Sequence, residues 1–222
     1  MSPSRPVRPR HAASLVLVRR TNGIAEILMG RRPKKAAFIP DAFVFPGGRL
    51  DASDALVRPS APLPIHVLED LCARGGCTPA LARTLATTAI RETFEETGLA
   101  LVAPGDPGRS DGTWAAFTQQ RWAPAHERLR FLGRAITPTS SPIRFHARFF
   151  AATAEPLHGT LKSNGELSDL DWYPLGDAQR LPAIDVTQFV LAEIAAEEQG
   201  RARKAPFFRY RRNRPLAKSA DA

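Results

Sequence analysis

Runs of apolar positions interrupted by polar ones divide the chain into short strands and a few helices. Residues 12–20 and 25–31 are aliphatic and β-branched, and Thr21-Asn22-Gly23 lies between them. This pattern predicts two strands joined by a tight turn. The same criteria predict four further strands, at 42–45, 129–136, 145–152 and 170–173.

A long amphipathic helix is predicted in the middle of the chain. Thr78 suits the N-cap, Pro79 suits the first helical position, and the pattern continues to about Thr97. The apolar residues that recur at every fourth position and predict its buried stripe are Ala82, Ala86, Ile90 and Phe94. Shorter helices are predicted at 65–73, 113–122 and 186–198. Strands before, between and after helices predict an α/β/α layered fold with a mixed sheet.

Length and composition are those of one globular α/β domain. The chain has 222 residues, of which 43% are hydrophobic, and this is enough to bury a proper core. No apolar run approaches the roughly 18 residues of a membrane span, and residues 1–11 hold no apolar stretch of the signal-peptide type. Cys72 and Cys77 form a C-x4-C pair without nearby histidines, so we expect two reduced thiols. These features predict a cytoplasmic protein without a membrane partner.

Basic residues are concentrated at the two ends of a chain whose formal net charge is +9. They crowd an N-terminal tail (1–11) and a C-terminal segment (201–222), which flank a main domain at 12–200 with an insertion at about 55–83. The ends are either solvated tails or a positive field that attracts a polyphosphate ligand. Nucleic acid is a less favoured partner, because no zinc finger, RNP motif or helix-turn-helix accompanies the charge. Aromatic residues of the last segment predict that it packs back onto the domain; they are Phe207, Phe208 and Tyr210.

Three carboxylates stand where the long helix should least favour them. Glu92, Glu95 and Glu96 occupy positions i, i+3 and i+4, so they share a face, and Gly98 ends the helix just beyond them. Like charges at this spacing cost about 0.2–0.5 kcal/mol per pair, and the negative end of the helix dipole adds about 0.3–1 kcal/mol per charge. A bound divalent cation is the simplest compensation.

The alternative is an amphipathic helix whose acidic side lies in solvent. With Ile90 placed at 0°, a rotation of about 100° per residue puts the three carboxylates at roughly 140° to 240°, away from the buried stripe. The position on the helix therefore does not decide between a metal site and a solvated face.

The segment around these carboxylates resembles the Nudix box, whose pattern is G-x5-E-x7-R-E-U-x-E-E-x-G-U, with U a bulky aliphatic residue. The residues that match its second half are Arg91, Glu92, Glu95, Glu96, Gly98 and Leu99. Thr93 replaces the first aliphatic residue, and Asp54 stands six positions after Gly48, where the family has its first glutamate. The spacer has 36 residues (55–90) where the family has seven, so the resemblance is to a Nudix protein with a long insertion inside its box.

The resemblance implies a Nudix-type α/β/α sandwich with a mixed β-sheet and a metal-dependent hydrolase. The metal, Mg²⁺ or Mn²⁺, is expected on Glu92 and Glu96 first, with Glu95 and the Gly47 carbonyl as further ligands. Arg91 is expected to orient a glutamate, Glu92 and Glu95 are candidate catalytic residues, and Gly48 lets the backbone approach the substrate. The implied reaction is attack of water on phosphorus in a nucleoside diphosphate linked to another moiety.

Two upstream segments, at 27–32 and 38–48, resemble the coenzyme A diphosphatase branch of the family. Arg31 and Arg32 would then bind the extra phosphate of coenzyme A, or else they pair with Asp51 or Asp54. The branch implies hydrolysis of coenzyme A or acyl-coenzyme A. The alternatives are nucleotide sugars, dinucleotides or NADH as substrates, a non-catalytic nucleotide-sensing module, and a nucleic-acid binder that uses the basic ends.

Other residues keep two interpretations each. Asp54 is either a turn or cap residue or a member of the site, and Glu166 is either an exposed loop acid or a further ligand. His146 is a general base or, as we favour, a core or surface histidine. Trp114, Trp122 and Trp172 stack on a base or, as we favour, pack in the core. The insertion is a lid, a contact in a homodimer or a plain surface excursion.

Overall fold

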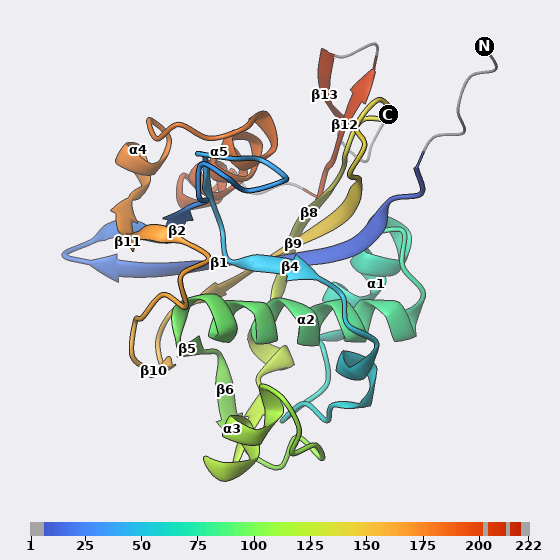
Figure 1. Ribbon diagram of the computed structural model, residues 1–222, viewed down its shortest axis with the longest axis vertical. Coiled ribbons are helices and arrows are strands. Elements are labelled where there is room, and N and C mark those ends of the chain that lie inside the picture. The colour runs from blue at the N-terminus through green and yellow to red at the C-terminus, as the bar shows by residue number, and fades with distance from the viewer. Residues whose placement is uncertain (1–6, 202–203, 212–213, 219–222) are drawn as a thin grey trace.

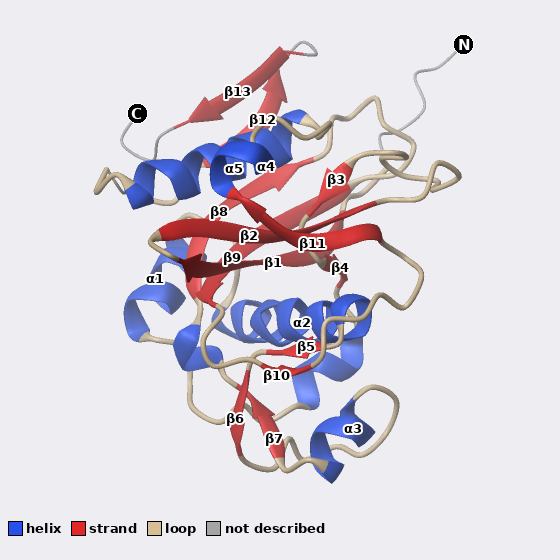
Figure 2. Cartoon of the chain, turned by 90° about the vertical axis from the view of Figure 1, so that its left-hand side faces the viewer, coloured by secondary structure: helices blue, strands red, loops and turns tan. Residues whose placement is uncertain are grey.

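The computed structural model describes residues 7–201, 204–211 and 214–218, which form a central sheet with helices on both faces (Figure 1). Helix α2 (Pro79–Thr97) lies along one face, and α4 (Leu175–Ala178) and α5 (Asp185–Glu198) lie on the other. Figure 2 shows the same three layers from the side. The predicted α/β/α sandwich is therefore confirmed.

The central sheet is mixed, as predicted. Its strands are β1 (Arg10–Thr21), β2 (Ile24–Arg31), β3 (Phe43–Val44), β4 (Gly47–Arg49), β8 (Arg130–Ile136), β9 (Phe145–Thr153), β11 (Ser168–Pro174), β12 (Phe207–Arg211) and β13 (Arg214–Lys218). The main order is β11-β2-β1-β9-β8-β12-β13, with β3 beside β2 and β4 beside β1. Strand β1 runs antiparallel to β2 and β4 but parallel to β9.

Strand β1 shows how the sheet is covered on both faces. Leu15 and Leu17 are buried in the cluster that packs against α2, whereas Val16 and Val18 are buried in the cluster that packs against α5. Successive side chains of a strand point to opposite faces, so a continuous apolar run serves both cores.

Helix α2 begins and ends where the sequence predicts. The Thr78 hydroxyl accepts a hydrogen bond from the Leu81 N–H at 3.2 Å, which satisfies a free donor of the first turn. Gly98 has φ 70°, and its N–H donates to the Phe94 carbonyl at 2.8 Å. Ala82, Ala86 and Ile90 are fully buried and form the predicted stripe against the sheet.

The insertion is part of the main core and is not a plain surface excursion. A 3-10 helix, η1 (Ala52–Leu56), precedes it, and α1 (Ile65–Ala73) occupies its middle. Val57, Leu63, Val67 and Leu71 are buried in the same cluster as the α2 stripe. Burial of these side chains fixes the insertion on the α2 side of the sheet.

Smaller elements extend the molecule beyond α2. Strand β5 (Leu99–Ala100) pairs with β10 (His158–Gly159), and β6 (Val102–Pro104) pairs with β7 (Trp122–Pro124). Helix α3 (Trp114–Gln119) and the 3-10 helix η2 (His126–Arg128) complete this part. The predicted helix at 113–122 ends three residues early, because Trp122 starts β7.

The C-terminal segment packs back onto the domain, as its aromatic residues predict. Strand β12 pairs parallel with β8, with Phe207 opposite Arg134, and β13 pairs with β12. At the other end β1 starts at Arg10, inside the predicted tail. Residues 1–6, 202–203, 212–213 and 219–222 of the two basic ends lie outside the described residues.

The two cysteines and the apolar content of the helices agree with the composition. Cys72 and Cys77 are both free thiols. Among the described residues, no helix combines the length and apolar character needed to cross a membrane.

Candidate active site

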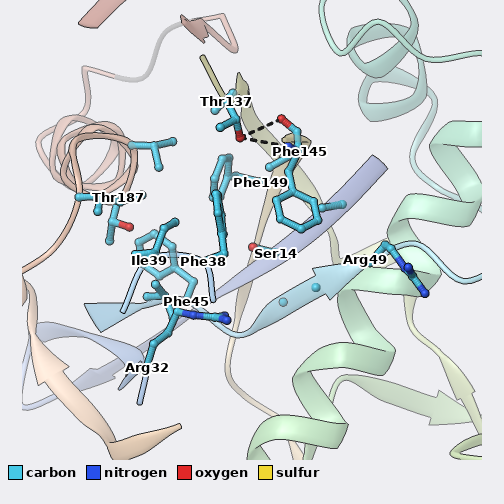
Figure 3. Close-up of a pocket in the computed structure, with 18 of the residues that line it drawn as sticks. Ser14, Arg32, Phe38, Ile39, Phe45, Arg49, Thr137, Phe145, Phe149 and Thr187 are labelled. Carbon is cyan, nitrogen blue, oxygen red and sulfur yellow. Dashed lines mark hydrogen bonds between the residues drawn. The ribbon is translucent and has the colours of Figure 1, made fainter. Parts of the chain in front are cut away.

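A cavity of about 560 Å³ opens on the face of the sheet that carries α5 (Figure 3). Its walls come from segments far apart in the chain: β1, β4, α2, β8, β9, the start of α5, β12 and the loop after β2. The charged side chains that line it are Arg32, Arg49, Glu92, Glu96 and Glu166. A volume of about 300–1,000 Å³ is typical of sites that hold cofactor-sized ligands.

Strand β4 brings the two glycines of the Pro-Gly-Gly run directly against α2. The Gly47 N–H donates to Oε2 of Glu96 at 2.9 Å. A Cβ at Gly48 would lie 2.4 Å from Oε2 of Glu92, and one at Gly47 would lie 2.5 Å from atoms of Ser14. A side chain at Gly47 would meet the backbone of β1, and one at Gly48 would displace the Glu92 carboxylate, so both glycines are needed for this arrangement.

Arg91 lies at the centre of a buried ion-pair network beside the cavity. Its Nε and one terminal nitrogen donate to the two oxygens of Asp54 at 2.8 and 3.0 Å. Its other terminal nitrogen contacts Glu92 at 2.9 Å and Glu95 at 2.7 Å. A further bond of 3.1 Å reaches the Arg49 carbonyl, which ties the network to the end of β4. Arg91 thus contacts both Glu92 and Glu95, and its role in orienting a glutamate stays a prediction.

Asp54 serves both as a cap residue and as a partner of the site. It is 1% exposed, and it also accepts hydrogen bonds from the Thr88 hydroxyl at 2.8 Å and the Asp51 N–H at 3.3 Å. Asp54 therefore reaches Arg91 although its side chain is one methylene shorter than the glutamate of the family pattern. Sequence reasoning did not identify Thr88, a helical threonine whose partner is distant in the chain.

The three predicted glutamates have different surroundings. Glu95 is held by Arg91 and by the Thr113 hydroxyl, and it does not line the cavity. Glu92 and Glu96 do line it. Within the described residues there is no group of three or more His, Cys, Asp or Glu side chains close enough together to hold a metal ion.

Burial raises the pKa of both cavity glutamates. The pKa of Glu92 rises to about 7, because burial disfavours the charged form and Glu95 adds repulsion, although Arg91 opposes the shift. The pKa of Glu96 rises to about 8, again mainly through burial, with Glu92 and Glu166 adding to it and the Gly47 N–H opposing it. Burial acts to lower the pKa of Arg91, but Asp54, Glu92 and Glu95 together raise it. The α2 face predicted as acidic is thus largely shielded from water.

The side chains present fit a hard divalent cation. Carboxylate and carbonyl oxygens are the ligands that Mg²⁺ and Mn²⁺ take in proteins. Glu92 and Glu96 come from one helix, the backbone at Gly47 and Gly48 approaches both, and Glu166 lines the same cavity from another loop. A cation beside them would offset the cost of two adjacent buried carboxylates.

The other predicted binding residues lie in different surroundings. Arg32 lines the cavity, whereas Arg31 does not. Arg31 pairs with Asp41 at 2.8 Å and with Asp169 at 3.9 Å, so the alternative that it pairs with Asp51 or Asp54 is wrong. The reason is that β2 points Arg31 toward β11 and the loop before β3. Glu166 is exposed at the edge of the cavity, and its carboxylate accepts a bond from Asn164 at 3.3 Å.

His146 lies outside the cavity, and the structure does not place it as a base for this site. It is half-buried on β9, and its pKa is lowered to about 3 by burial and by the charges of Arg148, Arg134 and His11. Trp114, Trp122 and Trp172 belong to the core on the α2 side, as we favoured, and none of them lines the cavity.

Comparison with solved structures identifies similar folds. No family model matches the chain. The structure is similar to that of a NUDIX hydrolase from Alicyclobacillus acidocaldarius, with 30% sequence identity, a TM-score of 0.63, and coverage of 85% of this chain and 92% of that chain. In fold alone it is similar to the MutT protein from Bacillus halodurans, with 13% identity, a TM-score of 0.52, and coverage of 94% and 97%. It is also similar in fold to the NUDIX domain of Shewanella oneidensis NrtR complexed with ADP ribose, with 12% identity, a TM-score of 0.51, and coverage of 86% and 89%.

Among curated proteins the chain is similar to acyl-coenzyme A diphosphatase NUDT19 of Xenopus laevis. The two are 33% identical over 99 residues, and the match covers 36% of this chain and 26% of that protein. The chain therefore spans about a quarter of the length of this relative.

Proposed function

Since the chain belongs to the Nudix hydrolase family, we propose that it hydrolyses the diphosphate bond of coenzyme A or of an acyl-coenzyme A, with Mg²⁺ or Mn²⁺ as cofactor. The partial match to an acyl-coenzyme A diphosphatase supports this substrate, as does the resemblance of residues 27–32 and 38–48 to that branch. The proposed partner is thus a small molecule and not nucleic acid or a membrane. The proposed compartment is the cytoplasm.

One observation carries the proposal. Glu92 and Glu96, one turn apart on α2, lie against the backbone of Gly47 and Gly48 at the wall of a cavity large enough for a nucleotide derivative. Together with the Gly47 carbonyl they are the groups that would hold the cation, and Glu166 is a further carboxylate in reach of the same cavity. When bound, the cation neutralises diphosphate charge and makes water a stronger nucleophile.

Side chains around these ligands orient the reacting groups. Arg91 keeps Glu92 in place, and Asp54 fixes Arg91 through two hydrogen bonds. Arg32 and Arg49 line the cavity, where a guanidinium can bind phosphate oxygens by charge-assisted hydrogen bonds. Glu166, exposed and outside the Arg91 network, is the carboxylate that can accept a proton from the attacking water.

A substrate panel tests the function. Coenzyme A, an acyl-coenzyme A, ADP-ribose, NADH, a nucleotide sugar and a dinucleoside polyphosphate are incubated with Mg²⁺ or Mn²⁺ in oxygen-18 water. Mass spectrometry then identifies the products and the phosphorus that gained the label. We expect an adenosine bisphosphate and a phosphopantetheine product. Turnover of the other compounds without the coenzyme A compounds would reject the substrate, and binding without any hydrolysis would favour the nucleotide-sensing alternative.

Two matched variants locate the chemistry on α2. Glu96→Gln removes a cavity carboxylate and is expected to lower kcat/KM by about 10²–10⁴-fold, the range for a residue acting directly on the reaction. Glu95→Gln alters a residue held by Arg91 and Thr113, so we expect a smaller loss of about 10–100-fold, typical of a group that acts through its neighbour. Equal losses in the two variants would contradict this division of roles.

A further inference from the structure

The cavity has two chemically different ends. The acidic end is formed by Glu92, Glu96 and Glu166 near the glycines of β4. The rest of the lining includes an apolar wall, which we define as Phe38, Ile39, Ile136, Phe145, Phe149 and Phe208. Figure 3 shows Phe38, Phe145 and Phe149 with their rings gathered around one space. The diphosphate chemistry uses the acidic end and leaves the apolar wall without an assigned role.

Ring contacts fix members of the apolar wall in place, one pair within the wall and one between the wall and α5. Phe38, in the loop after β2, meets Phe145 of β9 edge-on with ring centroids 5.0 Å apart. Phe208 of β12 packs against Phe189 of α5 at 5.1 Å. The wall is therefore formed before any ligand arrives, and its β12 part comes from the C-terminal segment.

Ile39 has an unusual backbone conformation in the loop after β2. It lines the cavity with φ 51°, a left-handed conformation that a β-branched residue rarely adopts. Such backbone conformations persist where the surroundings hold them, and they are commonest at ligand sites. The strained residue keeps an apolar side chain over the cavity.

Two hydroxyl groups beside this wall, those of Thr137 and Tyr210, are already engaged within the protein. The Thr137 hydroxyl accepts from the Phe145 N–H at 3.0 Å and donates to the Phe145 carbonyl at 3.3 Å. The Tyr210 hydroxyl donates to Asp185 at 3.2 Å. Among the described lining residues there is no Asn, Gln, Asp or His to read the polar edge of a nucleobase. A hydrocarbon needs no such partners and gains by leaving water.

The geometry points to the apolar wall as the binding site for the acyl chain of a coenzyme A thioester, with Phe208 as a residue that determines chain-length preference. This inference rests on the proposed function, because it places the diphosphate at the acidic end. It predicts that acyl-coenzyme A, and not free coenzyme A, is the better substrate. If a nucleobase occupied this space instead, kcat/KM would not depend on the length of the acyl chain.

A chain-length series provides the test. Values of kcat/KM are measured with Mn²⁺ for coenzyme A and its acetyl, butanoyl, hexanoyl and octanoyl thioesters. We expect a rise of about three- to fourfold for each methylene that the wall buries, the fold-change that corresponds to burial of one CH₂. A flat series would overturn the inference and leave the proposed function standing. No turnover of any compound in the series would instead reject the proposed function.

Two phenylalanines on β12 provide a matched pair of variants. Phe208→Ala removes part of the wall and is expected to reduce the gain per methylene. Phe207→Ala changes the neighbouring residue, whose ring lies under Arg134 at 3.9 Å on the other face of the sheet, and should keep the wild-type gain. If Phe208→Ala fails to fold, Phe38→Ala in the loop takes its place. Equal gains in wild type and the wall variant would overturn the inference.

Metal-free calorimetry gives a readout that does not depend on catalysis. Binding of octanoyl-coenzyme A in the presence of EDTA should show a more negative heat-capacity change than binding of coenzyme A, because apolar surface is buried. Phe208→Ala should shrink this difference, whereas Phe207→Ala should retain it. Identical heat-capacity changes for the two ligands would contradict the inference.

Discussion

Arg91 and Asp54 form an ion pair that is almost fully removed from water, with side chains 10% and 0% exposed. Without the Asp54 charge, the buried guanidinium loses two charge-assisted hydrogen bonds and keeps Glu92 and Glu95 as its charged partners. We expect Asp54→Asn to lower the free energy of unfolding by about 1.5–3 kcal/mol, as measured by urea denaturation of the purified variant.

Asp70 provides a matched control for this change. It also pairs with an arginine, Arg74, but on the surface of α1, where the aspartate side chain is 36% exposed. Exposed pairs of this kind contribute less than about 1 kcal/mol, so Asp70→Asn should scarcely change the urea midpoint. Similar losses for the two variants would show that the Asp54 pair is no more important than a surface contact.

The residues of the site differ in how far the sequence reveals them. Glu92 and Glu96 could be predicted because the spacing of two residues on one helix is local. The ion pair of Asp54 with Arg91 could not be decided, since 36 residues separate the two positions and only the fold of the insertion brings them together. Glu95 stays a predicted metal ligand; its contact with the Thr113 hydroxyl, from a loop after β6, could not be predicted because the two residues belong to separate elements.

At the scale of elements, the end of α2 gives the sharpest test. Gly98 has φ 70°, and a Cβ there would lie 2.4 Å from the Thr160 carbonyl oxygen. We expect Gly98→Ala to destabilise the protein by about 2 kcal/mol or more, because the left-handed conformation alone costs about 1–2 kcal/mol for a residue with a Cβ. Thermal and urea unfolding measure the change.

Gly176, in α4, is the matching glycine without these constraints. Its φ is not positive, and a Cβ there would meet nothing within 4 Å. Gly176→Ala should therefore be neutral or stabilise the protein by up to about 1 kcal/mol, since alanine reduces the freedom of the unfolded chain. A loss as large as that of Gly98→Ala would argue against the steric explanation.

Elements with a strong local pattern follow the sequence closely, and the others depend on distant partners. Helix α2 has an N-cap, a proline and a glycine that define its ends, and α1 matches its predicted bounds. Strands β5 and β10 have two residues each and are held by pairing across the chain, so no local periodicity indicates them. The same is true of β12, whose aromatic residues predict packing but not the strand partner, β8.

At the scale of the whole molecule, the cavity exists only because the two ends of the chain join one sheet. Strand β1 lies inside the sheet, between β2 and β9, and β12 adds Phe208 and Tyr210 to the cavity wall from near the C-terminus. The insertion inside the Nudix box lies on the opposite side of the sheet and supplies no lining residue of the described part. An insertion of this size is compatible with the site because it packs on the core and leaves the cavity open.

Global stability should depend on pH through His126, which is 1% exposed beside α2. One ring nitrogen lies 3.0 Å from the Thr87 hydroxyl, and the pKa is lowered to about 4, mainly by burial and also by the charge of Arg83. The unfolded state keeps the ordinary value of 6.5, so it binds a proton at a higher pH than the folded state does. The contribution of His126 to the free energy of unfolding is therefore complete above pH 6.5. It is lost progressively as the pH falls to about 4, and the total loss is about 3 kcal/mol.

Unfolding in urea between pH 7 and pH 4 measures this dependence, and variants assign it. His126→Gln removes the titrating group, so its free energy of unfolding should fall less steeply with decreasing pH than that of the wild type. His66→Gln alters an exposed histidine on α1 and should keep the wild-type slope. The comparison between variants is needed because carboxylates with a shifted pKa also titrate as the pH falls. The lowered pKa values of Glu26 and Asp111 act in the same direction as His126, whereas the raised pKa values of Glu92 and Glu96 act in the opposite direction. An unchanged slope in His126→Gln would assign the acid sensitivity to the carboxylates with a lowered pKa or to His146, and the buried histidine would have no part in it.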